Sequence, residues 1–138
     1  PLSKNAPAGT MLGNGGGDMQ RIPAEFRKGL IHKKGALAAA RDGNPEKASS
    51  ACQFYLVEGN LVNDEMLNTM EQRKEMKYTA AQRSIYKSIG GTAFLDQDYT
   101  VFGEVESGLE VISKIANVPR DSNNRPTGDV RMRMELVK

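Results

Sequence analysis

Three short runs in this sequence have the composition of β-strands, and a block with a helical pattern separates the second run from the third. The runs are "GALAAARDG" at 35–43, "CQFYLV" at 52–57 and "YTVFGEV" at 99–105. Glycine and Asp-Gly bracket the first run, and aromatic and branched side chains enrich the other two. Between them, residues 60–91 are charged, methionine-rich and helical in pattern. The sequence therefore predicts a mainly β scaffold that carries an inserted helical segment at about 60–91.

Within the inserted block, the spacing predicts two short helices. Met66 and Met70 stand four residues apart, on one face of a helix. "TAAQ", from Thr79 to Gln82, matches a capping box, in which the two side chains satisfy free N–H groups at a helix start. Gly90 is a suitable end for the second helix.

The last third of the chain predicts one more helix and a strand. Ser107 and Glu110 have capping-box spacing, and they precede apolar residues at helical spacing, Val111, Ile112 and Ile115. The tail "DVRMRMELVK" alternates polar residues with the apolar Val130, Met132, Met134 and Leu136. Such alternation predicts a half-buried antiparallel strand.

Composition excludes several classes of protein. The length of 138 residues fits a single domain, 1–138. A net charge of +2, from 19 basic and 17 acidic residues, leaves no excess for tracking phosphates, so nucleic acid is not the expected partner. One cysteine and one histidine make neither a disulfide framework nor a Cys/His zinc site within the chain.

The sequence shows no membrane span and no signal-peptide layout. No apolar run approaches the ~20 residues that a spanning helix needs. The start, "PLSKNAPAGTMLGNGGGD", lacks Met and has loop composition throughout, as though a segment preceded it. We expect a soluble chain whose residues 1–20 form no regular element. Its compartment, whether the bacterial cytoplasm or the periplasm and envelope, stays open because a targeting segment would lie upstream.

The only cysteine lies in a strand-like run, where alternation separates two faces. Cys52 shares one face with Phe54 and Leu56, and Gln53 shares the other with Tyr55. A nucleophilic thiol would need a neighbouring base, and the sequence offers no sign of one. The favoured interpretation is therefore a packed core thiol.

Other catalytic patterns are weak. The only histidine, His32, stands between apolar residues and lysines, where a structural or solvated role is favoured over a ligand or base. The cluster "GNGGGD" has neither a preceding strand nor a following Lys-Ser/Thr, so a phosphate loop is disfavoured. No spaced carboxylate pair of the kind that hydrolases use is visible.

What remains is an amide beside aromatic side chains. Gln53 and Tyr55 share a strand face, and "AFLDQDYTVFG" supplies Phe94, Leu95 and Tyr99. Two interpretations stay open at this point: an ordinary exposed strand face, or a groove for an extended apolar peptide.

Three ordered blocks resemble consecutive blocks of bacterial-type cyclophilins, which are peptidyl-prolyl cis-trans isomerases. The blocks are "IPAEF...HKKGALAAAR", "ASSACQFYLVEG" and "AFLDQDYTVFGEVESGLEVISKI". The resemblance runs from about Ala8 to the C-terminus, interrupted near 60–91. It implies an eight-stranded antiparallel β-barrel capped by two helices, with the active groove on the outer barrel surface and no cofactor.

The resemblance also assigns site residues. It implies that Ala40 and Arg41 form a rim for the substrate backbone, Arg41 through main-chain groups, and that Gln53 hydrogen-bonds the substrate near the prolyl amide. The proline pocket would be walled by Tyr55, Phe94 and Leu95, with Tyr99 where many relatives have histidine. In many family members Tyr55 is Phe, Phe94 is Trp and Arg41 is Asn. On this interpretation Gln53 is the catalytic candidate and Cys52 is barrel core.

One difference from the family is larger than these single-residue differences. A Phe-His-Arg motif and a Phe-Met-x-Gln-Gly-Gly-Asp run would precede Pro1, and this sequence contains neither. The chain thus resembles the C-terminal two-thirds of a cyclophilin domain, an incomplete barrel, and we expect it to be poorly active alone.

The implied partners are proline-containing peptides and unfolded proteins, together with either a separate N-terminal fragment or a strand-exchanged copy. The alternative function is a non-catalytic proline-peptide-binding or chaperone module.

Overall fold

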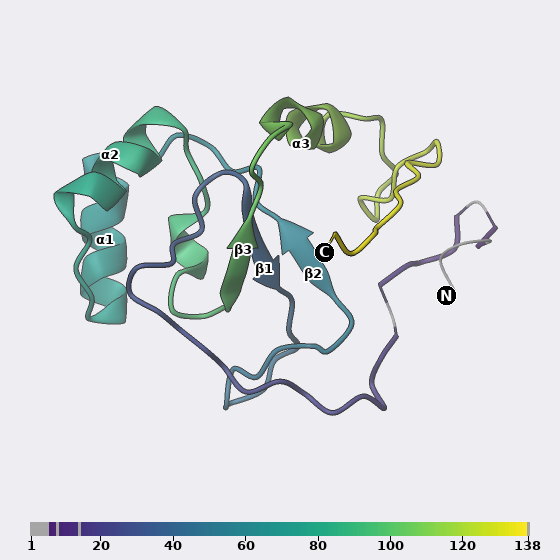
Figure 1. Cartoon of the computed structure of the whole chain (residues 1–138), viewed down its shortest axis with the longest axis horizontal. Helices are drawn as coiled ribbons and strands as arrows, with labels where there is room; N and C mark the ends of the chain where they lie inside the picture. Colours follow the sequence, from purple (N-terminus) through teal and green to yellow (C-terminus); the bar gives the residue numbers. More distant parts are fainter. Residues whose placement is uncertain (1–5, 8, 14, 138) are drawn as a thin grey trace.

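The computed structural model describes residues 6–7, 9–13 and 15–137. Its sheet is antiparallel and three-stranded, in the order β2-β1-β3. The strands are β1 (Ala36–Ala39), β2 (Phe54–Leu56) and β3 (Val101–Glu104), each inside a run that the sequence predicts as a strand. Figure 1 shows that the sheet is open, with β2 and β3 at its edges. The antiparallel prediction is confirmed, and the described residues do not close a barrel.

Pairing along β1 fixes the register of the sheet. Ala38 lies opposite Tyr55 of β2. On the other side, the register shifts between Leu37 and Ala38, where β1 pairs with β3. Small side chains in β1 allow close packing, and the sheet core consists of Ala36, Ala38, Val57 and Val101 with Tyr55 packed against it.

Residues 60–91 form two helices, as predicted. They are α1 (Asp64–Lys74) and α2 (Ala80–Ser88), and a 3-10 turn, η1 (Ala93–Leu95), follows. Thr79 and Gln82 make both hydrogen bonds of the predicted capping box. In Figure 1 both helices lie together on one side of the sheet. They enclose a second core made of Ile31, Val62, Leu67, Tyr78, Tyr86 and Ala93.

A backbone crossing connects this helical segment to the sheet. Gly91 bridges both Lys33 and Asn60. Its φ is 156°, and a Cβ at this position would lie 2.2 Å from the carbonyl oxygen of His32. No other residue type fits there without displacing backbone, which explains the glycine after α2.

The third helix forms where the sequence predicts it, but its N-terminal cap differs from the predicted one. It is α3 (Leu109–Ala116), and its N-cap is Gly108 in the left-handed region, with no side-chain cap hydrogen bond. The predicted Ser107 capping box is therefore wrong. The reason is that the positive φ of Gly108, 83°, starts the helix one residue later than Ser107 would require.

The C-terminal tail is not a strand in the described residues. Residues 129–137 have no regular structure and are exposed, including Val130, Met132, Met134 and Leu136. A strand needs a partner edge for its N–H and C=O groups, and no described segment pairs with the tail. The strand prediction for the tail is therefore wrong for the described residues, because an alternating pattern forms a strand only where a partner edge is present.

The prediction for Cys52 is also wrong. Alternation along the strand is as expected, but Cys52 is exposed, and Phe54 and Leu56 are 41% and 42% exposed. The face that packs on the sheet core instead carries Tyr55 and leads to the buried Val57. Period two identifies which residues share a face, whereas the covering layer decides which face is buried.

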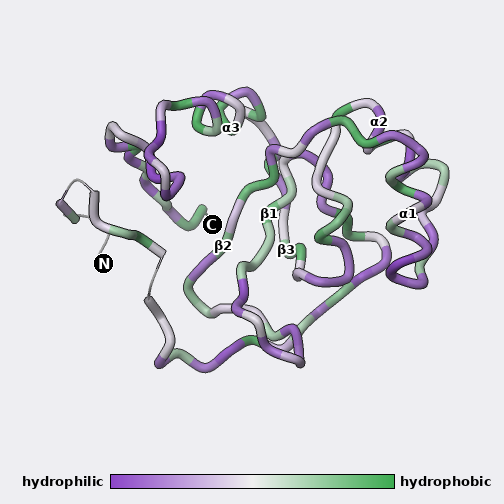
Figure 2. Tube along the Cα trace, turned by 180° about the vertical axis from the view of Figure 1, so that it is seen from behind, coloured by the Kyte–Doolittle hydropathy of each residue, from purple (hydrophilic) through white to green (hydrophobic). Residues whose placement is uncertain are grey.

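Hydrophobic residues are spread over the strands and helices rather than gathered into one long run (Figure 2). In the part of the chain that the structure describes, we find no helix with the length and apolar character to cross a membrane.

A buried carboxylate in α1 makes stability depend on pH. The backbone N–H of Tyr78 donates to Glu71 over 2.8 Å. Lys77 and Arg83 each approach the same carboxylate to 2.9 Å. The Tyr78 hydrogen bond, followed by those of the two cations, lowers the pKa of Glu71 from 4.5 to about 2.

Because the folded protein holds Glu71 ionised, the unfolded chain takes up the proton first as pH falls. We expect the urea midpoint to decrease from about pH 5 towards pH 2, with a smaller decrease in Glu71→Gln. The measurement is urea unfolding at several pH values. If the urea midpoint decreased equally with pH in the parent protein and in Glu71→Gln, this role of Glu71 would be contradicted.

Candidate functional site

Gln53 lies just before β2, beside the glycine-rich segment near the N-terminus. Its Nε2 donates to the carbonyl oxygens of Gly13, at 2.7 Å, and Gly15, at 3.5 Å. Its own main-chain carbonyl accepts from the N–H of Ala40, at 3.0 Å. A cavity of about 320 Å³ adjoins the amide, with Gly13, Met19, Arg41, Ser50 and Gln53 in its lining. The fold thus brings Gly13, Ala40 and Gln53, which are far apart in the sequence, into contact.

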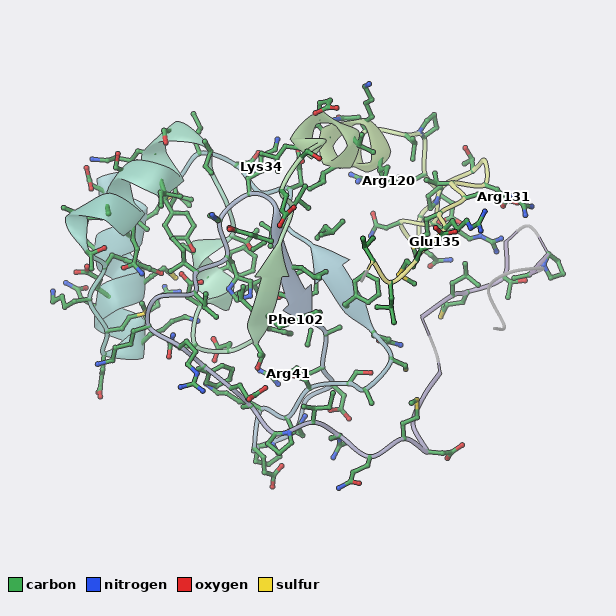
Figure 3. The ribbon with its side chains drawn as sticks, in the orientation of Figure 1. Lys34, Arg41, Phe102, Arg120, Arg131 and Glu135 are labelled. Carbon is green, nitrogen blue, oxygen red and sulfur yellow. The ribbon has the colours of Figure 1, made fainter. Side chains whose placement is uncertain are left out.

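The side chain of Arg41 is held in place at the end of β1 (Figure 3). Its Nε donates to the carbonyl oxygen of Asp98 over 2.7 Å, and its Nη1 donates to that of Asp42 over 2.9 Å. The guanidinium carbon lies 4.7 Å from the centre of the Tyr99 ring, within cation–π range. Arg41 therefore both lines the cavity and contacts the Tyr99 ring.

Two further rings, those of Tyr55 and His32, continue from Tyr99 into the protein. Tyr55 meets Tyr99 edge to face at 6.1 Å between ring centroids. On its other side Tyr55 stacks on His32 at 6.2 Å. Burial, and then the neighbouring Tyr99 and Asp96, raise the pKa of Tyr55 above its ordinary value, so it stays protonated. Its hydroxyl has no partner among the described residues.

Phe94 and Leu95 lie on the turn η1. Phe94 is 60% exposed, and Leu95 is half-buried. The turn continues to Tyr99, whose N–H donates to the Leu95 carbonyl over 3.1 Å. In the described part of the chain, Phe94 makes no ring contact with Tyr55 or Tyr99. The structure therefore brings Arg41, Tyr55 and Tyr99 together, and places Phe94 and Leu95 on the adjoining turn.

Lysines anchor the far end of this turn. The carboxylate of Asp98 accepts from Lys47, at 2.5 Å, and from Lys74. Burial alone would raise the pKa of Asp98, but the hydrogen bonds from the two lysines outweigh it and lower that pKa below its usual value.

Asp96 is a neighbour of the candidate site that the sequence did not reveal. One carboxyl oxygen accepts from the backbone N–H of His32 and lies 2.8 Å from its Nδ1. The other accepts from the hydroxyls of Tyr78, at 2.7 Å, and Tyr86, at 2.6 Å. His32 and Asp96 are each 1% exposed.

The structural interpretation of His32 is thereby confirmed. Burial, followed by the Asp96 charge, raises the pKa of both tyrosines. The residues of this cluster are widely separated in sequence and follow no motif, so no sequence signal pointed to it.

The described groups of the candidate site are ones that bind. Cys52 is exposed, and the chain's only imidazole, His32, is buried against Asp96, so a histidine does not activate this thiol. In the described ranges, no three His, Cys, Asp or Glu side chains cluster as metal ligands. An amide donor, aromatic faces and an arginine can instead hold an extended peptide.

Comparison with known proteins gives one family. Residues 3–135 match the family model described as cyclophilin type peptidyl-prolyl cis-trans isomerase/CLD. The chain is 35% identical over 98 residues to a peptidyl-prolyl cis-trans isomerase of Acinetobacter baylyi, covering 71% of this chain and 37% of the relative.

It is also 32% identical over 132 residues to a Staphylococcus saprophyticus protein provisionally named with the same activity, covering 94% of this chain and 64% of that protein. The chain thus spans less than two thirds of the length of these relatives.

Proposed function

Because the chain belongs to the cyclophilin-type peptidyl-prolyl cis-trans isomerase family, we propose that the protein accelerates X-Pro isomerisation in proline-containing peptides and unfolded proteins. The observation that carries this proposal is the Gln53 amide beside a cavity bordered by Arg41, whose guanidinium lies over the Tyr99 ring, which in turn meets the Tyr55 ring. No cofactor enters the proposal.

The reaction needs little covalent chemistry. Resonance holds the X-Pro bond planar behind a barrier of about 18–20 kcal/mol. A catalyst must bind the twisted amide better than either planar isomer. Transferring the proline from water to aromatic walls and donating hydrogen bonds to the peptide both serve that end.

We assign the roles as follows. Gln53 donates its amide N–H to a substrate carbonyl near the prolyl bond, replacing its present contact with the Gly13 carbonyl. Ala40 and Arg41 form the rim along the substrate backbone. The proline ring packs among Tyr55, Phe94, Leu95 and Tyr99, which lie on β2, on η1 and after that turn.

The domain assignment is part of the same proposal. Residues 1–138 form part of one cyclophilin domain, in which the open sheet closes into a barrel with further strands and 60–91 is an insertion. Support comes from the exposed apolar side chains Phe54, Leu56 and Phe102 on the two edge strands. Unpaired edges of this kind favour association.

The partner strands would come from a separate N-terminal fragment or an exchanged copy. Intact mass and size-exclusion measurements on the native protein distinguish these two sources. A monomer without a second polypeptide would contradict both.

The test of function is a protease-coupled assay of X-Pro isomerisation with the full-length protein. Acceleration over the uncatalysed exchange, which takes tens to hundreds of seconds, is expected. A full-length protein that leaves the exchange rate unchanged would exclude the enzyme.

A binding module is the second candidate, because the Gln53 amide and the Tyr55 and Tyr99 rings are groups that bind a peptide without a covalent step. Such a module would bind proline-containing peptides and prevent aggregation of unfolded proteins without changing the isomerisation rate. Binding without acceleration in the full-length protein would favour this candidate over the isomerase.

Replacing Gln53 by alanine should weaken peptide binding. Loss of one neutral hydrogen bond costs about 0.5–1.5 kcal/mol, or roughly a twofold to tenfold increase in Kd. The chain has no tryptophan, so the anisotropy of a labelled proline-containing peptide is a suitable readout. Gln72→Ala, at an exposed position in α1, is the matched control. Equal affinities of the two variants would remove Gln53 from the site.

A further inference from the structure

The helical insertion contacts the turn that carries the proposed proline pocket. Lys74 is the last residue of α1, and its side chain is only 14% exposed. Its Nζ donates to the main-chain carbonyls of Phe94, at 2.8 Å, and Asp96, at 2.6 Å. It also donates to the carboxylate of Asp98. One ammonium group thus spans the turn from Phe94 to Asp98.

The number of partners matches the chemistry of lysine. An ammonium group has three N–H donors and no acceptor. The two carbonyls and the carboxylate use all three donors. A carbonyl pair that faces a cation in a partly buried place is costly to leave unpaired, so the lysine determines the path of the turn.

The side chain of Phe94 cannot set that path by its own burial. It is 60% exposed, so packing against the protein restrains it little. Its position follows from its backbone, and Lys74 holds the carbonyl of that residue. The restraint on the pocket wall is therefore applied at the main chain.

The same helical segment holds the turn a second time. The hydroxyls of Tyr78, before α2, and Tyr86, within α2, both donate to the side chain of Asp96. The helical segment therefore binds the turn in two ways. Lys74 binds main-chain carbonyls of the turn, and the two tyrosines bind the buried carboxyl group of Asp96.

We propose that Lys74 is a positioning residue, through which the helical insertion sets the orientation of Phe94 and Leu95 for the proline ring. This inference rests on the proposed function. It makes the segment 60–91 part of the binding apparatus rather than an appendage of the sheet.

The test compares Lys74→Met with Lys87→Met in the 138-residue chain. Both changes remove one ammonium and keep an apolar stem, and the ammonium of Lys87, whose side chain is 47% exposed, pairs with Asp64 and with no other carboxylate among the described residues. The first readout is amide hydrogen exchange across Phe94–Asp98. It should accelerate about tenfold or more in Lys74→Met and stay unchanged in Lys87→Met.

The second readout is the Kd for a labelled proline-containing peptide, measured well below the unfolding midpoint of each variant. Lys74→Met should bind about fivefold to tenfold more weakly than the parent, and Lys87→Met equally well. Lys74→Arg, which keeps the charge and several donors, should recover part of the affinity. In the full-length enzyme, Lys74→Met should raise KM more than it lowers kcat.

The outcomes separate this inference from the proposed function. Unchanged exchange in the turn, or weakened binding in both methionine variants alike, would overturn the positioning role. A parent chain and full-length protein that bind no peptide would overturn the proposed function, and the positioning of a proline pocket with it. Faster exchange and weaker binding in Lys74→Met alone would support both.

Discussion

Replacing Asp96 by alanine is expected to lower the free energy of unfolding by about 3–5 kcal/mol, because this one carboxyl group satisfies several buried donors. The Tyr86 hydroxyl and the backbone N–H of His32 would lose their acceptor, and the Tyr78 hydroxyl would be left with the Ala93 carbonyl at 3.3 Å. A domain of this size has a total stability of about 5–15 kcal/mol, so the loss is a large fraction of it.

Urea unfolding measures this effect, with Asp96→Asn and Asp129→Ala as companions. Asparagine keeps the volume and one carbonyl oxygen, so its loss should be smaller than that of alanine. Asp129 is exposed and pairs with the exposed Arg131, and its replacement should leave the midpoint unchanged. An Asp96→Ala protein as stable as Asp129→Ala would mean that the cluster does not stabilise the fold.

The second large effect concerns catalytic rate. Family resemblance assigns polarisation of the prolyl nitrogen to an arginine in a Phe-His-Arg motif, which this sequence does not contain. Removing one preorganised donor from an active site costs on the order of 10²–10³ in rate. We expect kcat/KM of the 138-residue chain to be lower by that factor than that of the same chain extended at Pro1 by the family's segment.

An extension in which the arginine of the motif is alanine separates catalysis from folding. It restores the same length of chain without the donor, so its rate should stay near that of the 138-residue chain. If the alanine extension were as active as the arginine extension, the donor argument would be wrong and strand completion would explain the gain.

The local elements could be predicted from sequence because each depends on neighbours within one turn or one strand. The capping box of Thr79 and Gln82 needs only residues three apart, and it forms. The strands at 36–39, 54–56 and 101–104 lie within runs chosen by composition and turn residues. The Ser107 box failed for an equally local reason, since Gly108 adopted a positive φ.

Which face is covered could not be predicted in the same way. Cys52 and Phe54 share a face, as alternation requires, yet that face is exposed while Tyr55 packs inward. Likewise the tail has perfect alternation and no partner edge in the described residues. Burial of a strand face depends on a second layer, and that layer is a tertiary property.

The candidate site, too, was predictable from the sequence only in part. The residue types at Gln53, Tyr55, Phe94 and Tyr99, and the family to which they point, were available from sequence alone. Only the tertiary structure showed how the site is held together: Arg41 over the Tyr99 ring, His32 stacked on Tyr55, and Lys74 with Asp96 beneath the turn.

These contacts join residues twenty or more positions apart. Periodicity and capping act over a few residues, so they determined the elements and the chemistry available to this protein. Long-range hydrogen bonds and ring contacts form only when the chain has folded, and they decided which of those side chains lie together in the candidate site.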